Sequence, residues 1–210
     1  MDRKLYVLVS KSDTAMGRLI RTVCRYPYNH VSLSLDPEHR HWVSFARRVQ
    51  DAPLYGGFIH EDAQRLLSCG AQQPVRMYEI PIDEERARHL EQIFAIAGQI
   101  DCGLLYNLFD AAASVFGFRV SIPGAYTCLS FANTVLGTDH RTIASLCDGL
   151  QEQLVYEGVL SGLMTDDGSR SDPFFRRIGP VRATWKAAVH FAALSRRAVK
   201  RRFRDPLRVD

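Results

Sequence analysis

Hydrophobic and polar positions alternate in the first part of the chain in a way that is typical of β-strands. Residues 30–35 alternate strictly between polar and apolar side chains, and a turn-forming segment follows at residues 36–39. A period of two indicates strands that bury one face. We therefore expect strands at residues 4–9, 30–35, 40–46 and 75–80, with the second and third forming a hairpin.

Helical spacing of apolar residues dominates the later part of the chain. A recurrence at i, i+3, i+4 and i+7 predicts an amphipathic helix. The first stripe of this kind is Met16, Leu19, Ile20 and Val23, preceded by the candidate N-caps Ser12, Asp13 and Thr14. We expect helices in this first region and over residues 84–98, 104–116, 127–136, 140–150 and 184–204.

Two segments show no clear period. Residues 47–73 contain Pro53 and the pair Gly56 and Gly57, which predicts a long loop with one helical turn near residues 61–67. Residues 162–182 are rich in Gly, Ser, Asp and Pro and predict irregular structure. Strands early and helices late indicate an α+β fold. We expect a body over residues 1–160, followed by an irregular segment and a basic C-terminal helix over 161–210.

Composition adds limits on the class of protein. The chain has 210 residues, of which 46% are hydrophobic and 24% charged, as in ordinary globular proteins. The apolar runs are shorter than the roughly 18 to 20 residues that span a bilayer, and the first residues do not resemble a secretion signal. We therefore expect a cytoplasmic protein.

The net charge of +4 is concentrated at the C-terminus. Residues 196–210 hold seven Lys or Arg and two Asp, which leaves about −1 for the rest of the chain. Nucleic-acid binding is a poor interpretation, because the near-neutral body offers no strand face that combines basic and aromatic residues. With Trp185 and Phe191, the basic helix predicts either a solvated helix end or a contact with an anionic membrane surface.

One cysteine stands apart from the other four. The odd total of five, without CxxC spacing, argues against disulfides and a zinc site, and we expect no metal or cofactor. Cys128 follows Pro123 and Gly124 and lies in the first turn of an expected helix, where free N–H groups and the helix dipole favour a thiolate. Ordinary apolar roles are expected for Cys24, Cys69, Cys102 and Cys147.

His30 is the candidate general base, because the first residue of a strand is held rigidly and can still reach a cleft. A nucleophilic cysteine also needs a polar group that orients the histidine ring. Ser44 is the first candidate for this third role, since a three-residue turn would place it opposite His30. His41 is the second candidate, and Glu61 is the third.

Several segments together resemble a known family. The circularly permuted papain-like branch of the NlpC-type superfamily has its histidine strand before its cysteine helix, as here. The resemblance covers about residues 4–160 and is carried by residues 17–20, 28–33, 42–47, 56–58, 106–108 and 126–131. It implies a small antiparallel sheet packed on helices, with Cys128 as nucleophile, His30 as base and the third polar position nearest Ser44.

The resemblance also implies an activity. The chain would be a cysteine hydrolase or acyltransferase, similar to amidases, peptidases or enzymes like lecithin retinol acyltransferase. Its substrate would be a small peptide, an amide or a lipid-like acyl compound with an amide, ester or thioester bond. The alternative is a catalytically inactive binding module on the same fold. It is motivated by Leu129 and Phe131, where relatives more often have Ser and an acidic or amide residue.

Overall fold

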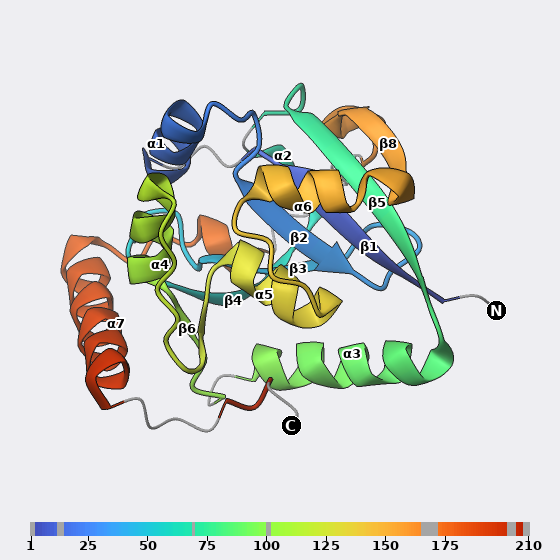
Figure 1. Ribbon diagram of the computed structural model, residues 1–210. Helices are drawn as coiled ribbons and strands as arrows, with labels where there is room; N and C mark the ends of the chain where they lie inside the picture. The colour runs from blue at the N-terminus through green and yellow to red at the C-terminus, as the bar shows by residue number, and fades with distance from the viewer. Residues whose placement is uncertain are drawn as a thin grey trace.

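The computed structural model describes residues 3–11, 15–68, 70–99, 102–164, 172–200 and 205–207. These residues form a mixed α+β fold around a six-stranded antiparallel sheet, which confirms the expected fold class (Figure 1). The order across the sheet is β4-β3-β2-β1-β5-β8. Its strands are β1 (Arg3–Ser10), β2 (His30–Ser34), β3 (Trp42–Arg47), β4 (Gly56–Glu61), β5 (Pro74–Ile82) and β8 (Leu154–Val159).

Helices surround the sheet, and a short two-stranded parallel ribbon precedes the cysteine helix. The ribbon consists of β6 (Leu105–Tyr106) and β7 (Ala125–Tyr126). The α-helices are α1 (Ala15–Cys24), α2 (Ala63–Leu67), α3 (Glu84–Gly98), α4 (Leu108–Ala113), α5 (Cys128–Leu136), α6 (Ile143–Gly149) and α7 (Pro180–Lys200). Short 3-10 helices are η1 (Ser114–Phe116), η2 (Gln151–Gln153), η3 (Leu160–Gly162) and η4 (Pro173–Phe175). In the described part of the chain, no helix has the length and apolar character needed to cross a membrane.

The main core lies between one face of the sheet and helices α3, α5 and α6. Alternate strand residues such as Val31 and Phe45 pack there against Leu90 of α3, Phe131 of α5 and Leu146 of α6. The other sheet face carries a second cluster around Trp42, which packs with α2 and η3. The alternating side chains expected over residues 30–35 therefore point to opposite faces of the sheet. Both faces are covered by other parts of the chain.

The prediction of a long loop over residues 47–73 is wrong, because this segment contains strand β4. Gly56 and Gly57 start this strand and do not form a turn. A Cβ atom on Gly56 would lie 2.7 Å from Cβ of Tyr106, so the glycine is required by the close approach of the β6 side chain. The expected helical turn near residues 61–67 is present as α2.

Other boundaries also differ from expectation. The helix expected over residues 104–116 starts with strand β6, and β8 was not expected at all. The helix expected over 140–150 is shorter, because Thr142 caps it. α7 begins at Pro180, four residues before the expected start, with a proline in its first turn, a favoured site for this residue. Residues 201–204, which the prediction included, lie outside the described residues.

The first helix is present as α1, but its expected buried stripe is only partly visible. Val23 is half exposed and not buried. The side chains of Met16, Leu19 and Ile20, and the candidate caps at residues 12–14, lie outside the described residues.

Candidate active site

Helix α5 begins at Cys128 because Thr127 caps it. The Thr127 hydroxyl accepts a hydrogen bond from the Ser130 backbone N–H at 3.2 Å, and the Ser130 hydroxyl accepts one from the Thr127 N–H at 2.7 Å. This reciprocal capping box defines the start of the helix. The first helical residue is therefore the cysteine that the sequence singled out.

The start of α5 leaves backbone donors available beside the thiol. The Phe131 N–H donates to the Thr127 carbonyl, and the Ser130 N–H is taken by the capping box. Among the described residues, no acceptor is recorded for the N–H groups of Cys128 and Leu129. Unpaired donors at the positive end of a helix stabilise negative charge, so an anionic oxygen would be stabilised at this position.

His30 begins β2 and forms a close buried pair with Glu61, the last residue of β4. Both carboxylate oxygens of Glu61 lie 3.0 Å from Nε2 of His30. The Ser32 hydroxyl donates to Oε2 of Glu61 at 2.5 Å. The strand register places these three residues on one face of the sheet. The carboxylate therefore fixes the orientation of the imidazole ring from two strands away.

Arg65 on α2 forms a second ion pair with the Glu61 carboxylate. Nε of Arg65 lies 3.5 Å from Oε1 of Glu61, and Glu61 precedes Arg65 by four residues in the chain. Its Nη1 lies 3.7 Å from Oδ1 of Asp172, and its guanidinium stacks over the Phe174 ring at 4.3 Å from the centroid. Both ion pairs are buried, so Glu61 is neutralised from two directions in a region with little water.

The charges of this cluster shift the pKa values of its members in opposite directions. Burial by itself lowers the pKa of His30, but the Glu61 charge and hydrogen bonds with Cys128 and Glu61 outweigh it and hold this pKa well above 6.5. Burial raises the pKa of Glu61, but His30, Arg65 and Ser32 together bring it down to about 2. His30 is therefore an imidazolium paired with a buried carboxylate, and Cys128 contributes to its raised pKa.

The structure places Ser44 and His41 away from the position expected for the third residue. Leu33 pairs with Val43, so Ser44 lies opposite Ser32 and not opposite His30. The Ser44 hydroxyl donates to the Val31 carbonyl at 2.7 Å. His41 is exposed in the β2–β3 turn, where its carbonyl accepts from Ser34. Glu61, ranked third from the sequence, is the side chain that contacts His30.

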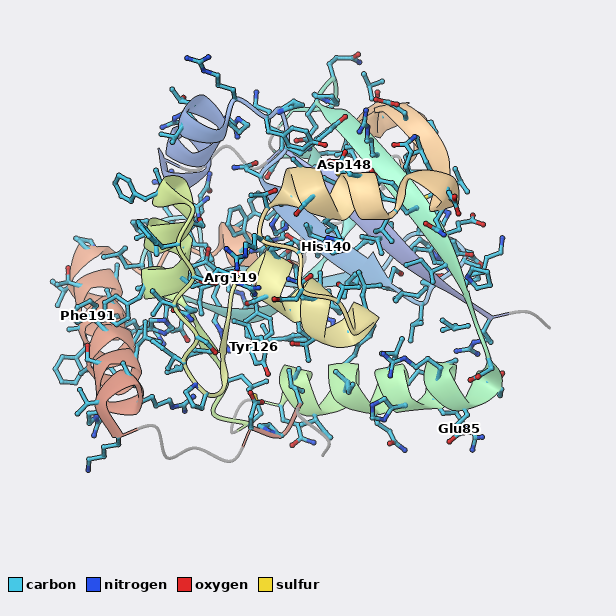
Figure 2. The ribbon with its side chains drawn as sticks, in the orientation of Figure 1. Glu85, Arg119, Tyr126, His140, Asp148 and Phe191 are labelled. Carbon is cyan, nitrogen blue, oxygen red and sulfur yellow. The ribbon has the colours of Figure 1, made fainter. Side chains whose placement is uncertain are left out.

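A groove of about 320 Å³ opens beside Cys128. Its walls include Tyr28 and Tyr106, and Arg119 stands at its edge between α4 and α5 (Figure 2). Burial and the charges of Cys128 and Asp110 raise the pKa of Tyr106, which keeps this phenol protonated. His30 does not line this groove.

A second, larger hollow adjoins this groove. Its volume is about 960 Å³, and the two share Asp110, Arg119 and Ser130. Arg119 forms an ion pair with Asp139 at this boundary. The site therefore continues beyond the immediate surroundings of the thiol.

Phe131 has a structural role that accounts for an aromatic residue at this position of α5. Its ring is buried and packs against Phe45 at 5.1 Å and Phe58 at 5.8 Å between ring centroids. An acidic or amide side chain at this position would have to be buried among aromatic rings without a partner. Phe131 therefore packs α5 against the sheet and leaves the cysteine end of the helix undisturbed.

The other two cysteines whose side chains are described lack this environment. Cys147 is fully buried, and Cys102 is partly buried with its thiol donating to the Ala97 carbonyl at 3.4 Å. The side chains of Cys24 and Cys69 lie outside the described residues. In the part of the chain that the structure describes, no cluster of three or more His, Cys, Asp or Glu side chains is placed to hold a metal ion.

Comparison of this chain with protein-family models, with curated proteins and with solved structures finds no match.

Proposed function

We propose that the protein is a cysteine hydrolase or acyltransferase in which Cys128 is the nucleophile and His30 the acid and base. The observation that carries the proposal is a buried histidine whose Nε2 is held by Glu61 and whose pKa is raised by interaction with Cys128, the first residue of α5. Nucleophile, base and orienting group in this order are the arrangement that thiol catalysis requires. Glu61 acts through His30 and is a positioning residue.

The proposed reaction has two stages. The Cys128 thiolate attacks the carbonyl carbon, a C–S bond forms, and the π electrons move to oxygen. The tetrahedral intermediate then collapses, the C–N, C–O or C–S bond to the leaving group breaks, and the His30 imidazolium supplies the proton that this group needs. In the second stage, water or another acceptor gives a proton to His30 and attacks the thioester, which releases the acyl group and regenerates the cysteine.

The oxyanion of each tetrahedral intermediate fits at the start of α5. The backbone N–H groups of Cys128 and Leu129 point out of the first turn and carry the positive end of the helix dipole. Because Nε2 of His30 is occupied by Glu61, Nδ1 is the ring nitrogen left to exchange a proton with the sulfur. In this proposal the thiol attacks the carbonyl carbon, the imidazole transfers the proton, and the two backbone N–H groups bind the oxyanion.

We also propose that the fold belongs to the permuted papain-like type. The support is the order of its parts: the histidine strand β2 precedes the cysteine helix α5, and this helix packs on the central antiparallel sheet. A polar residue on a nearby strand, here Glu61, completes the arrangement.

The groove favours an acyl compound with an apolar part as substrate. Tyrosine rings and the aliphatic side chains of Leu129 and Ile143 line it around the thiol. An acyl chain or a small peptide could bury apolar surface there, while the polar hollow beyond Arg119 offers room for a leaving group or an acceptor. We therefore propose a lipid-like acyl, peptide or amide substrate.

The test uses p-nitrophenyl esters with acyl chains of increasing length. We expect a burst of p-nitrophenol, an acyl adduct on Cys128 found by peptide mass spectrometry, and slower release of the acyl group. The Cys128→Ala variant should lose the burst and the adduct, and the His30→Ala variant should lose most of the turnover.

Cys102→Ala is the matched control, because it removes a partly buried thiol outside the groove. It should keep the burst and the adduct at Cys128. Acylation spread over several residues, or a burst of equal size in Cys128→Ala, would show that no activated nucleophile exists and would favour the inactive binding module.

A further inference from the structure

Helix α7 carries an outward-facing apolar stripe in addition to the side that packs on the body. Ala183, His190 and Leu194 are buried on the inner side. Residues spaced by three, four or seven positions face the opposite way, and all of them are exposed. We call these the outer stripe: Val181, Trp185, Ala188, Ala192 and Val199.

Three large apolar side chains on the outer stripe are mostly accessible to solvent. Val181 is 82% exposed, Trp185 70% and Val199 84%. Phe191, labelled on α7 in Figure 2, is also half exposed and touches the Phe109 ring of α4. A row of such residues along one helix marks an interaction surface.

The charges of α7 have a single sign. The helix holds five Lys or Arg and no acidic residue. Lys186 stacks over Tyr55 and Arg197 donates to the Gly124 carbonyl, so these two also attach the helix to the body. The other three cations are exposed beside or on the outer stripe: Arg182, Arg196 and Lys200.

The position of α7 is fixed relative to the body. Nε2 of His190 lies 2.9 Å from the carbonyl oxygen of Tyr106, whose ring lines the groove beside Cys128. Leu194 packs with Ile122 and Ala125 under the helix. The outer stripe is therefore held in place over the whole length of the helix, about 30 Å for 21 residues at 1.5 Å each.

We propose that the outer stripe of α7 binds an anionic lipid surface, with the helix lying in the plane of the membrane. An exposed apolar row with cations on it and beside it matches the boundary between acyl chains and negative headgroups. A second copy of the chain is a poor occupant, because it would bring the same cations against each other. The proposal rests on α7 alone and does not depend on the chemistry of Cys128.

Co-sedimentation with vesicles tests it on the full chain. We expect binding to vesicles of phosphatidylcholine mixed with phosphatidylglycerol, little binding to phosphatidylcholine alone, and weaker binding at high salt. Exchanging Arg182, Arg196 and Lys200 together for Gln should lower the partition coefficient by about fivefold per cation. Trp185→Ser should also weaken binding, whereas the control Val155→Ser, at an exposed position on β8, should not.

Tryptophan fluorescence gives a second readout. The chain has two tryptophans, and Trp42 is fully buried whereas Trp185 is exposed. Anionic vesicles should therefore shift the emission of Trp185 to shorter wavelength, and Trp185→Phe should lose the shift and still bind. Equal binding to both kinds of vesicle, no binding, or self-association without lipid that Trp185→Ser abolishes would overturn the proposal.

Discussion

Glu61 holds His30 from two strands away, with both of its carboxylate oxygens 3.0 Å from Nε2 of the imidazole. The pair is buried, and the carboxylate is itself held by Ser32 and Arg65. The Glu61 charge raises the pKa of the ring, and in the proposed mechanism Nδ1 is the nitrogen that exchanges a proton with Cys128. The proposed chemistry therefore depends on a residue that does not line the groove beside Cys128.

Replacing Glu61 with Gln should lower the pKa of His30 toward or below 6.5. The Glu61 charge opposes the effect of burial in the folded protein, and the amide lacks this charge. NMR titration of the His30 ring measures the change directly. Glu157→Gln, which removes a surface carboxylate paired with Arg76, is the control and should not move the His30 titration. An unchanged His30 pKa in Glu61→Gln would contradict the role assigned to Glu61.

Ser44→Ala should leave the site chemistry intact. The Ser44 hydroxyl bonds the Val31 carbonyl, so its loss should cost about 1 kcal/mol of unfolding free energy. Urea denaturation measures this cost, and alkylation of Cys128 measures reactivity. A large loss of Cys128 reactivity in a folded Ser44→Ala protein would restore Ser44 as the orienting residue.

Arg65→Leu should destabilise the protein strongly. The change leaves Asp172 without a buried cation and removes one of the partners of Glu61, a type of loss that costs about 3 to 5 kcal/mol. Urea denaturation of Arg65→Leu and Arg65→Lys provides the comparison, and the lysine variant should recover part of the loss. Equal stability of Arg65→Leu and the original protein would show that the buried ion pairs contribute nothing.

The His30–Glu61 pair should give the protein a defined pH range of added stability. The raised pKa of His30 contributes stability that is complete below about 6.5 and is lost as the pH rises through the higher folded value. The lowered pKa of Glu61 contributes stability that is complete above about 4.5 and is lost as the pH falls toward about 2. Urea denaturation should show the largest difference between the original protein and Glu61→Gln from pH 4.5 to 6.5. A difference that does not change with pH would contradict the pairing.

Phe131→Ala should cost about 3 to 5 kcal/mol, because it removes a buried ring from an aromatic cluster that joins α5 to the sheet. Thermal unfolding would measure the loss. Leu129→Ala, at a partly buried position in the groove, is the matched change on the same helix and should cost less. A smaller loss for Phe131→Ala than for Leu129→Ala would contradict the structural role given to the ring.

Local sequence signals were sufficient to single out two of the three residues of the candidate site. Cys128 could be predicted because a cap and a helix start are properties of neighbouring residues, and His30 because alternation marks the start of its strand. Glu61 was only a weak candidate, because Gly56 and Gly57 obscured β4. Their placement depends on Tyr106, fifty residues later, and no local pattern contains that information.

The strand register expected for Ser44 is wrong for a similar reason. The Asp36 carboxylate accepts hydrogen bonds from the N–H groups of Glu38, Arg40 and His41, so the turn takes up more residues than a tight hairpin. This longer turn moves Ser44 two positions along the partner strand, opposite Ser32. A side chain that binds several turn N–H groups therefore decided which residue faces His30.

Alkylation of Cys128 by iodoacetamide, followed by peptide mass spectrometry at pH about 6.5, tests the central claim most directly, because only thiolate reacts and free cysteine is mostly protonated there. Cys102 in the same molecule serves as the internal reference. We predict that Cys128 reacts faster than Cys102 and that His30→Ala slows Cys128 by about tenfold or more, with Cys102 unchanged. Equal rates for Cys128 in the original protein and in a folded His30→Ala variant would contradict an activated thiol.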